Sequence, residues 1–134
     1  MHTADPRLPK VLLVEDDPAA LHFYADALSS SGFRVDKASS GAEALRAAEA
    51  NDLAVIVADL GLPDFDGFEI CRQVKLRAET RQVPVIAITG RAMALRDIEL
   101  AEEAGFHAVL IKPCPPETLV AAIAKALNGT RQAR

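Results

Sequence analysis

The stretch "IVADLGLPDFDG", Ile56–Gly67, joins a buried strand to three aspartates. The strand itself, "AVIVA" at Ala54–Ala58, is continuous in apolar residues, which is typical of a parallel strand covered on both faces. Asp59 comes directly after it. A strand that only had to end could use Gly or Asn at this place, so the carboxylate of Asp59 indicates a chemical role.

Four other apolar runs of strand length lie on both sides of this stretch. Three of them are nearly continuous in Val, Ile, Leu and Ala, as expected for strands covered on both faces. One run, at residues 33–38, alternates between apolar and polar residues and therefore suits an edge strand. In chain order the four runs are "KVLLV" (Lys10–Val14), "FRVDKA" (Phe33–Ala38), "VPVIAIT" (Val83–Thr89) and "HAVLI" (His107–Ile111).

Helical patterns with their own start and stop residues lie between these runs. Asp17 before Pro18 predicts a helix start, and Gly32 predicts its end. Ser40 precedes a second helix with the spacing of a capping box, and Asp66 precedes a third in a looser form. The last two helices are expected at Arg91–Ala104, closed by Gly105, and at Pro116–Leu127, closed by Asn128-Gly129.

Strand and helix thus alternate five times, and right-handed crossovers place such a chain in a doubly wound α/β fold, a parallel sheet with helices on both faces. A length of 134 residues, with 50% apolar and 25% charged residues, fits one domain. We place this domain at residues 10–128, between flexible tails at 1–9 and 129–134. In such sheets ligands bind beyond the carboxyl ends of the strands.

Charge and hydropathy narrow the class of partner. The net charge of −4 argues against direct nucleic-acid binding, which needs a basic face, and favours protein partners. No apolar run reaches the roughly 18 residues of a membrane span, and the first residues lack the apolar core of a signal peptide, so we expect a cytoplasmic protein with no membrane contact. Cys71 and Cys114 match neither a zinc site nor a redox pair and are expected to be reduced thiols.

Polar residues follow four of the strands, and parallel strands share one carboxyl edge. Glu15 and Asp16 follow the first strand and Asp59 the third. Three carboxylates held close in a partly dry crevice repel each other unless they take up protons or bind a cation. Ligands that are all oxygen, without His or Cys, favour Mg²⁺. Thr89 ends the fourth strand, and Lys112 follows the fifth.

These groups suit phosphoryl transfer. A hard cation, a carboxylate, a hydroxyl and an ammonium group are the components that it requires, because negative charge spreads over three phosphoryl oxygens in the transition state. A carboxylate can act as the nucleophile and form an acyl phosphate. Asp59 is the candidate for that nucleophile.

Each of these residues also has a purely structural interpretation. Asp17 fits a helix cap, and Asp64 and Asp66 fit a turn and a cap. Taken alone, Thr89 would be an ordinary strand residue and Lys112 a solvated surface charge. The joint placement of the polar groups at the ends of neighbouring strands favours the functional interpretation.

Four motifs in this order, "LLVEDDP", "ADLGLPDFDG", "IAITG" and "LIKP", resemble the receiver domain of bacterial two-component response regulators, of the stand-alone type found in chemotaxis. The resemblance covers nearly the whole chain. It implies a flavodoxin-like sandwich with a five-stranded parallel sheet of order 2-1-3-4-5. It also implies a signalling switch, not a conventional enzyme, that catalyses its own phosphorylation and dephosphorylation and alters its binding to a protein target.

The resemblance assigns a role to each candidate site residue. Asp59 would accept a phosphoryl group, in a Mg²⁺-dependent reaction, from a phosphohistidine on a sensor histidine kinase or a histidine phosphotransfer protein. The remaining assignments are Asp16 and Asp59 as direct Mg²⁺ ligands, Glu15 as a ligand through metal-bound water, the Gly61 carbonyl as a further ligand, and Thr89 and Lys112 as contacts of the phosphoryl oxygens.

The chain departs from the family around its fifth strand. Val109 stands where members often carry an aromatic switch residue, and Cys114 stands where Phe often follows the Lys-Pro pair. The Lys112–Pro113 bond is expected to be cis, as is usual in the family. Arg91 is expected to modulate hydrolysis of the aspartyl phosphate by donating hydrogen bonds to it.

Two alternatives share parts of this pattern. A phosphatase of the haloacid-dehalogenase type also pairs a nucleophilic Asp with Mg²⁺ on a doubly wound sheet, but it needs a second Asp where this chain has Gly61. A pseudo-receiver would keep the fold as a binding module without phosphorylation, and the intact acidic cluster argues against it.

Overall fold

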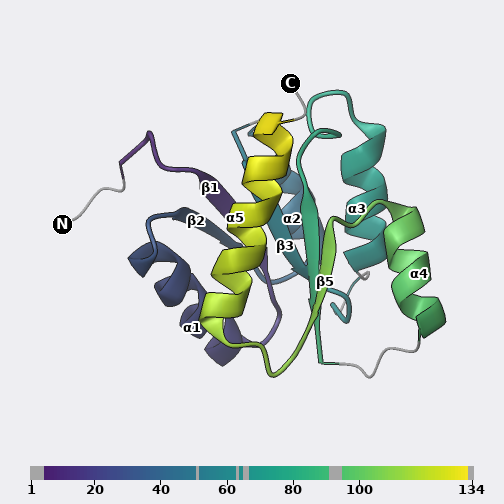
Figure 1. Ribbon diagram of the computed structural model, residues 1–134, viewed down its shortest axis with the longest axis horizontal. Helices are drawn as coiled ribbons and strands as arrows, with labels where there is room; N and C mark the ends of the chain where they lie inside the picture. Colours follow the sequence, from purple (N-terminus) through teal and green to yellow (C-terminus); the bar gives the residue numbers. More distant parts are fainter. Residues whose placement is uncertain (1–4, 51, 63, 65–66, 91–94, 133–134) are drawn as a thin grey trace.

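The computed structural model describes residues 5–50, 52–62, 64, 67–90 and 95–132, and in this part of the chain strands and helices alternate five times (Figure 1). Each strand coincides with a predicted run to within two residues at either end. The elements are β1 (Lys10–Val14), α1 (Pro18–Ser30), β2 (Arg34–Ala38), α2 (Gly41–Ala48), β3 (Val55–Asp59), α3 (Gly67–Leu76), β4 (Val85–Thr89), α4 (Leu95–Ala104), β5 (Ala108–Ile111) and α5 (Pro116–Gln132).

The strands form one parallel sheet in the order β2-β1-β3-β4-β5, which confirms the predicted flavodoxin-like topology. β2 lies at one edge, as its alternating sequence predicts. β5 lies at the other edge and is half-buried, with Ile111 exposed. Its two faces are covered as predicted, because Val109 packs against one core layer and Ala108 and Leu110 pack against the other. The apolar run does not indicate that β5 pairs with a strand on one side only.

Helices cover both faces of the sheet and create two layers of core. α1 and α5 lie in front of the sheet in Figure 1, and α2 and α3 lie behind it. Alternate residues of each strand enter the two layers. In β1, Val11 and Leu13 pack with α1 and α5, whereas Leu12 and Val14 pack with α2 and α3. Over the described residues, each helix is too short or too polar to cross a lipid bilayer.

The predicted boundaries of α1 and α2 recur in the structure. The Asp17 side chain accepts a backbone N–H of the first turn of α1 at 3.2 Å, and the Ser40 hydroxyl does the same for α2 at 3.2 Å. Gly32 and Gly105 have positive φ angles of 95° and 103°, which favour glycine, and they follow α1 and α4 as predicted.

α5 is longer than its sequence predicts. The expected stop at Asn128-Gly129 was wrong, because the helix continues through both residues to Gln132. Asn and Gly each cost a helix interior only about 1 kcal/mol or less relative to Ala, so they do not end a helix that packing stabilises. Ile123 and Ala126 of the preceding turns are buried in the core beside the sheet.

Asp64 caps a helix that is distant from it in the sequence. Its two carboxylate oxygens accept the backbone N–H groups of Gly41 at 2.8 Å and of Ala42 at 2.9 Å. These are the first two N–H groups of α2, which have no partner within the helix. Asp64 therefore caps α2 and attaches the loop after β3 to it. The predicted cap Asp66 and the expected helix start at Arg91 lie outside the described residues.

Replacement by alanine should change the stability of the fold in opposite directions at two helical glycines, Gly67 and Gly129. A Cβ at Gly67 would lie 2.9 Å from the Asp59 carbonyl oxygen. We expect Gly67→Ala to lower the free energy of unfolding by about 1–3 kcal/mol, because α3 would have to move away from β3. Gly129 lies inside α5 with nothing within 4 Å of its Cβ position, so Gly129→Ala should raise that free energy by about 0.5–1 kcal/mol.

Urea unfolding of the two variants beside the wild type measures both changes. A destabilised Gly129→Ala would contradict the continuous α5. An unchanged Gly67→Ala would contradict the close approach of α3 to the end of β3.

Candidate functional site

The register of the sheet brings polar residues together at the carboxyl ends of the strands, which form the carboxyl edge of the sheet. β1 and β3 are paired up to the residues before Glu15 and Asp59, so these two side chains lie on neighbouring strand ends. β4 and β5 are paired up to Thr89, and Lys112 is the first residue after β5. The carboxylates therefore converge as the order of the strands predicts.

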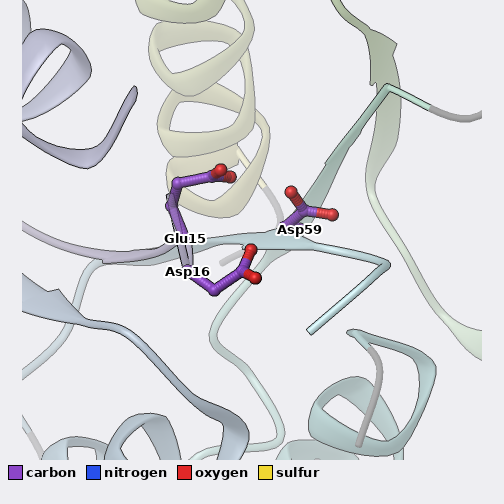
Figure 2. Close-up of side chains that lie close together, drawn as sticks. All are labelled: Glu15, Asp16 and Asp59. Atoms are coloured by element: carbon purple, nitrogen blue, oxygen red, sulfur yellow. The ribbon is translucent and has the colours of Figure 1, made fainter. Parts of the chain in front are cut away.

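The pleat of the strands determines on which side of this edge each group lies. Glu15, Asp59 and Lys112 each continue the alternate row of their strand that packs with α1 and α5. Asp16 continues the opposite row of β1, which packs with α2 and α3. Figure 2 shows that the carboxyl groups of Glu15 and Asp16 both extend toward Asp59.

Lys112 joins two of the carboxylates. Its ammonium group donates to Glu15 Oε2 at 2.9 Å and to Asp59 Oδ2 at 3.1 Å. Both partners are buried, Glu15 at 3% and Asp59 at 8% exposure, whereas Asp16 is exposed. Burial alone would lower the pKa of Lys112, but the two carboxylates outweigh it and raise that pKa. Lys112 is thus not the solvated surface charge of the structural interpretation.

The two buried carboxyl groups hold their protons unequally. Burial is the main reason that the pKa of Glu15 is raised to about 7, and its hydrogen bond with Asp59 adds to the rise, while Lys112 opposes it. Burial alone would also raise the pKa of Asp59, but hydrogen bonds outweigh it and lower that pKa. The donors of those bonds are Glu15, the Gly61 N–H at 2.7 Å and Lys112. Within the pair, Asp59 therefore releases its proton more readily than Glu15 does.

The acidic cluster has the ligand chemistry and the spacing of a magnesium site. One carboxylate oxygen from each of Glu15, Asp16 and Asp59 lies within 4.8 Å of the other two. Opposite ligands of an octahedral Mg²⁺ ion lie about 4.2 Å apart, and such an ion keeps several waters. Three carboxylates at this spacing fit one Mg²⁺ ion.

The end of β4 fixes the loop that follows β5. The Lys112 N–H donates to the Thr89 carbonyl at 2.8 Å, and the Thr89 side chain is buried at the same edge. The Lys112–Pro113 bond is cis, as the family resemblance implies. Gly90 has no side chain, and the Lys112 Cδ lies 3.9 Å from the place where its Cβ would stand. The stem of Lys112 thus passes over the end of β4.

Tyr24 contacts this loop in a way that the sequence does not indicate. The apolar stripe of α1 predicts a buried ring, and Tyr24 is buried, but its hydroxyl donates to the Cys114 carbonyl at 2.8 Å. A buried tyrosine usually has a polar partner for its hydroxyl, but the sequence does not indicate which group this is.

Cys71 and Cys114 are buried free thiols, as predicted. Val109 is half-buried against the layer of α2 and α3.

Comparisons of sequence agree with this geometry. The model of the response regulator receiver domain family matches residues 11–124. The transcriptional regulatory protein AfsQ1 of Streptomyces coelicolor is 34% identical over 126 residues, which cover 93% of this chain and 54% of AfsQ1. The polar-differentiation response regulator DivK of Brucella ovis is 34% identical over 103 residues, which cover 77% of this chain and 83% of DivK. The chain thus spans about half the length of AfsQ1 and most of DivK.

Comparisons of structure give the same family. A CheY-like response regulator receiver domain protein from Methanospirillum hungatei JF-1 matches with a TM-score of 0.86 and 29% identity, over 95% of this chain and 99% of that chain. Chemotaxis response regulator CheY4 of Vibrio cholerae matches with a TM-score of 0.83 and 28% identity, over 90% of this chain and 99% of that chain. Sequence, topology and the acidic edge agree, and the chain therefore belongs to the receiver domains of two-component response regulators, a family of signalling switches that work by phosphorylation of an aspartate.

Proposed function

We propose that Asp59 is the phosphoryl acceptor of this receiver domain. The observation that carries the proposal is the position of its carboxylate, which is buried at the end of β3 and accepts the Gly61 N–H at 2.7 Å and the Lys112 ammonium at 3.1 Å. Hydrogen bonds of this kind outweigh burial and lower the pKa of Asp59, whereas burial raises the pKa of the neighbouring Glu15. Only an ionised carboxylate is a competent nucleophile, so Asp59 is the better of the two buried groups. Asp16 is exposed, whereas Asp59 is buried and accepts the Lys112 ammonium.

The donor is a phosphohistidine on a sensor histidine kinase or a histidine phosphotransfer protein. One carboxylate oxygen of Asp59 forms a bond to phosphorus as the phosphorus–nitrogen bond of the donor breaks. The imidazole leaves with the electron pair of that bond and regains a proton. Asp59 becomes an acyl phosphate, which water later hydrolyses. Because the receiver supplies the catalytic groups, a small acyl phosphate should also serve as donor.

The surrounding residues support this transfer. Lys112 already contacts Asp59, and Thr89 lies at the neighbouring strand end, so both are placed to contact phosphoryl oxygens. The acidic cluster, with the Gly61 carbonyl, would hold Mg²⁺. When bound, that ion supplies positive charge against the charge of the phosphoryl group. Asp16 and Asp59 would bind it directly, and Glu15 would bind it through a metal-bound water.

The signal follows from the added charge. Phosphorylation of Asp59 places three new acceptor oxygens beside Lys112 and Thr89. This shifts the population between two conformations and changes affinity for a protein target. Val109 lacks the rotamer change of an aromatic residue, so Thr89 and α4 carry the switch. The site of action is the cytoplasm, where histidine kinases present their phosphohistidine.

Labelling with a small acyl phosphate tests the acceptor. In the presence of Mg²⁺ and acetyl phosphate, we expect the wild type to gain one phosphoryl group, located at Asp59 by peptide mass analysis. Asp59→Asn has the same shape but no nucleophilic oxygen anion, and should not be labelled. Asp17→Asn is the matched control, because Asn also caps helices and Asp17 makes a cap at the same edge. Equal labelling of the wild type and Asp59→Asn would refute the assignment.

The same preparation separates the switch from a phosphatase. A phosphatase of the haloacid-dehalogenase type needs an acid two residues after its nucleophile, and Gly61 occupies that place. We expect no multiple turnover of p-nitrophenyl phosphate, since nothing at Gly61 can protonate the leaving group. Sustained turnover that disappears in Asp59→Asn would favour the phosphatase.

Magnesium binding should depend on pH through Glu15. Its pKa is raised to about 7, so a proton occupies this carboxyl group at lower pH and competes with the cation. We expect the Mg²⁺ affinity, measured by calorimetry, to be about tenfold lower at pH 6 than at pH 8. The lowered pKa of Asp59 puts its own titration below this range.

Glu15→Gln is the control for this effect. The variant has no proton to lose, so its Mg²⁺ affinity should be weaker and nearly constant between pH 6 and pH 8. A wild-type affinity that stays constant over the same range would contradict the role of Glu15.

A further inference from the structure

The loop between β5 and α5 has few hydrogen-bond donors of its own. Pro113 and Pro115 of this loop, and Pro116 at the start of α5, lack a backbone N–H and cannot donate. The segment must therefore be held largely through its carbonyl groups and by donors from elsewhere. Lys112, whose ammonium contacts Asp59, is its first residue.

Two hydrogen bonds join the backbone of this loop to β4 and to α1. At its start, the Lys112 N–H donates to the Thr89 carbonyl at 2.8 Å. Two residues later, the Cys114 carbonyl accepts the Tyr24 hydroxyl at 2.8 Å. One tether comes from β4 and the other from α1, so Lys112 and the cis bond after it lie between two fixed points.

The Tyr24 tether is buried and well supported. Tyr24 is 7% exposed and packs in the same core layer as Cys114 and Leu119. Its ring meets Phe23 edge to face at 5.3 Å. In this dry layer a carbonyl that loses its donor is costly, because water cannot readily replace the hydroxyl. The bond therefore constrains the loop.

Tyr24 also connects the two sides of the phosphorylation site. α1 starts directly after the acidic pair of Glu15 and Asp16, and the loop held by Tyr24 starts with Lys112. The bond thus joins the helix that follows two metal-site carboxylates to the segment that carries the ammonium group. The Lys112 ammonium lies 2.9 Å from Glu15 Oε2 in this structure.

We infer that the Tyr24 hydroxyl is a positioning group for Lys112, holding its ammonium where the phosphoryl group of Asp59 forms. The inference rests on the proposed function of Asp59 and deepens it. Tyr24 does not touch the phosphoryl group, so it acts only through the loop. A small displacement of a charged group at a transfer site costs about tenfold or more in rate, which is the effect to look for.

Tyr24→Phe tests the inference, because it keeps the ring and removes the hydroxyl. Thr80→Val is the matched control: the buried Thr80 hydroxyl donates to the Val74 carbonyl, also at 2.8 Å, before β4 and so at the opposite edge of the sheet. Both variants lose one buried bond from hydroxyl to carbonyl. We expect both to lose similar stability, but only Tyr24→Phe to slow labelling of Asp59 by acetyl phosphate, by about tenfold.

A double-variant cycle separates positioning of Lys112 from a general loss of packing. Lys112→Ala should slow labelling by itself, and adding Tyr24→Phe should slow it no further, because the group that Tyr24 positions is gone. If the two effects multiply, Tyr24 does not act through Lys112 and the inference fails. Equal labelling rates of Tyr24→Phe and the wild type would also overturn it.

Hydrogen exchange gives a readout that does not need phosphorylation. Peptides that cover residues 111–119 should exchange faster in Tyr24→Phe than in the wild type, and at the wild-type rate in Thr80→Val. Unchanged exchange in Tyr24→Phe refutes the tether even if Asp59 is labelled. Absence of labelling in the wild type refutes the proposed function, and exchange then still decides whether Tyr24 holds the loop.

Discussion

The contact of the Lys112 ammonium with Glu15 and Asp59 is the interaction on which the site depends. Two buried carboxyl groups on neighbouring strand ends repel each other unless a cation or a proton lies between them. β3 and β5 are separated by β4, and neighbouring strands lie about 4.8 Å apart, so the cation must reach across about two such spacings. A long unbranched side chain that passes over Gly90 meets that requirement.

Much of the fold is predictable because its signals are local. The run at Lys10–Val14 coincides with β1, and Asp17 and Ser40 cap the helices that their spacing predicts. Five alternations of strand and helix then leave few topologies, since parallel crossovers have one hand. The convergence of Glu15 and Asp59 follows from the same rule, because parallel strands share their carboxyl edge.

The features that the sequence does not predict depend on partners distant in the chain. The sequence indicates a turn residue at Asp64, but its carboxylate oxygens accept two N–H groups of the first turn of α2. The sequence indicates a core residue at Tyr24, but its hydroxyl donates to the Cys114 carbonyl. α5 passes through Asn128-Gly129 because tertiary packing outweighs helix propensity. In each case the residue type indicates that a side chain can form a hydrogen bond, or that a helix can end. Only the folded structure determines which partner the side chain has and where the helix ends.

The pKa values of Glu15 and Asp59 differ because of the fold, and not because of the type of acid. Both are carboxyl groups, both are buried, and both contact Lys112. Asp59 also accepts the Gly61 N–H, which the turn after β3 supplies, and a hydrogen bond from Glu15. These donors stabilise the charged form of Asp59, so Asp59 releases its proton more readily than Glu15 does. Lys112 contacts both acids, so the Gly61 N–H of the turn after β3 is what distinguishes Asp59 from Glu15.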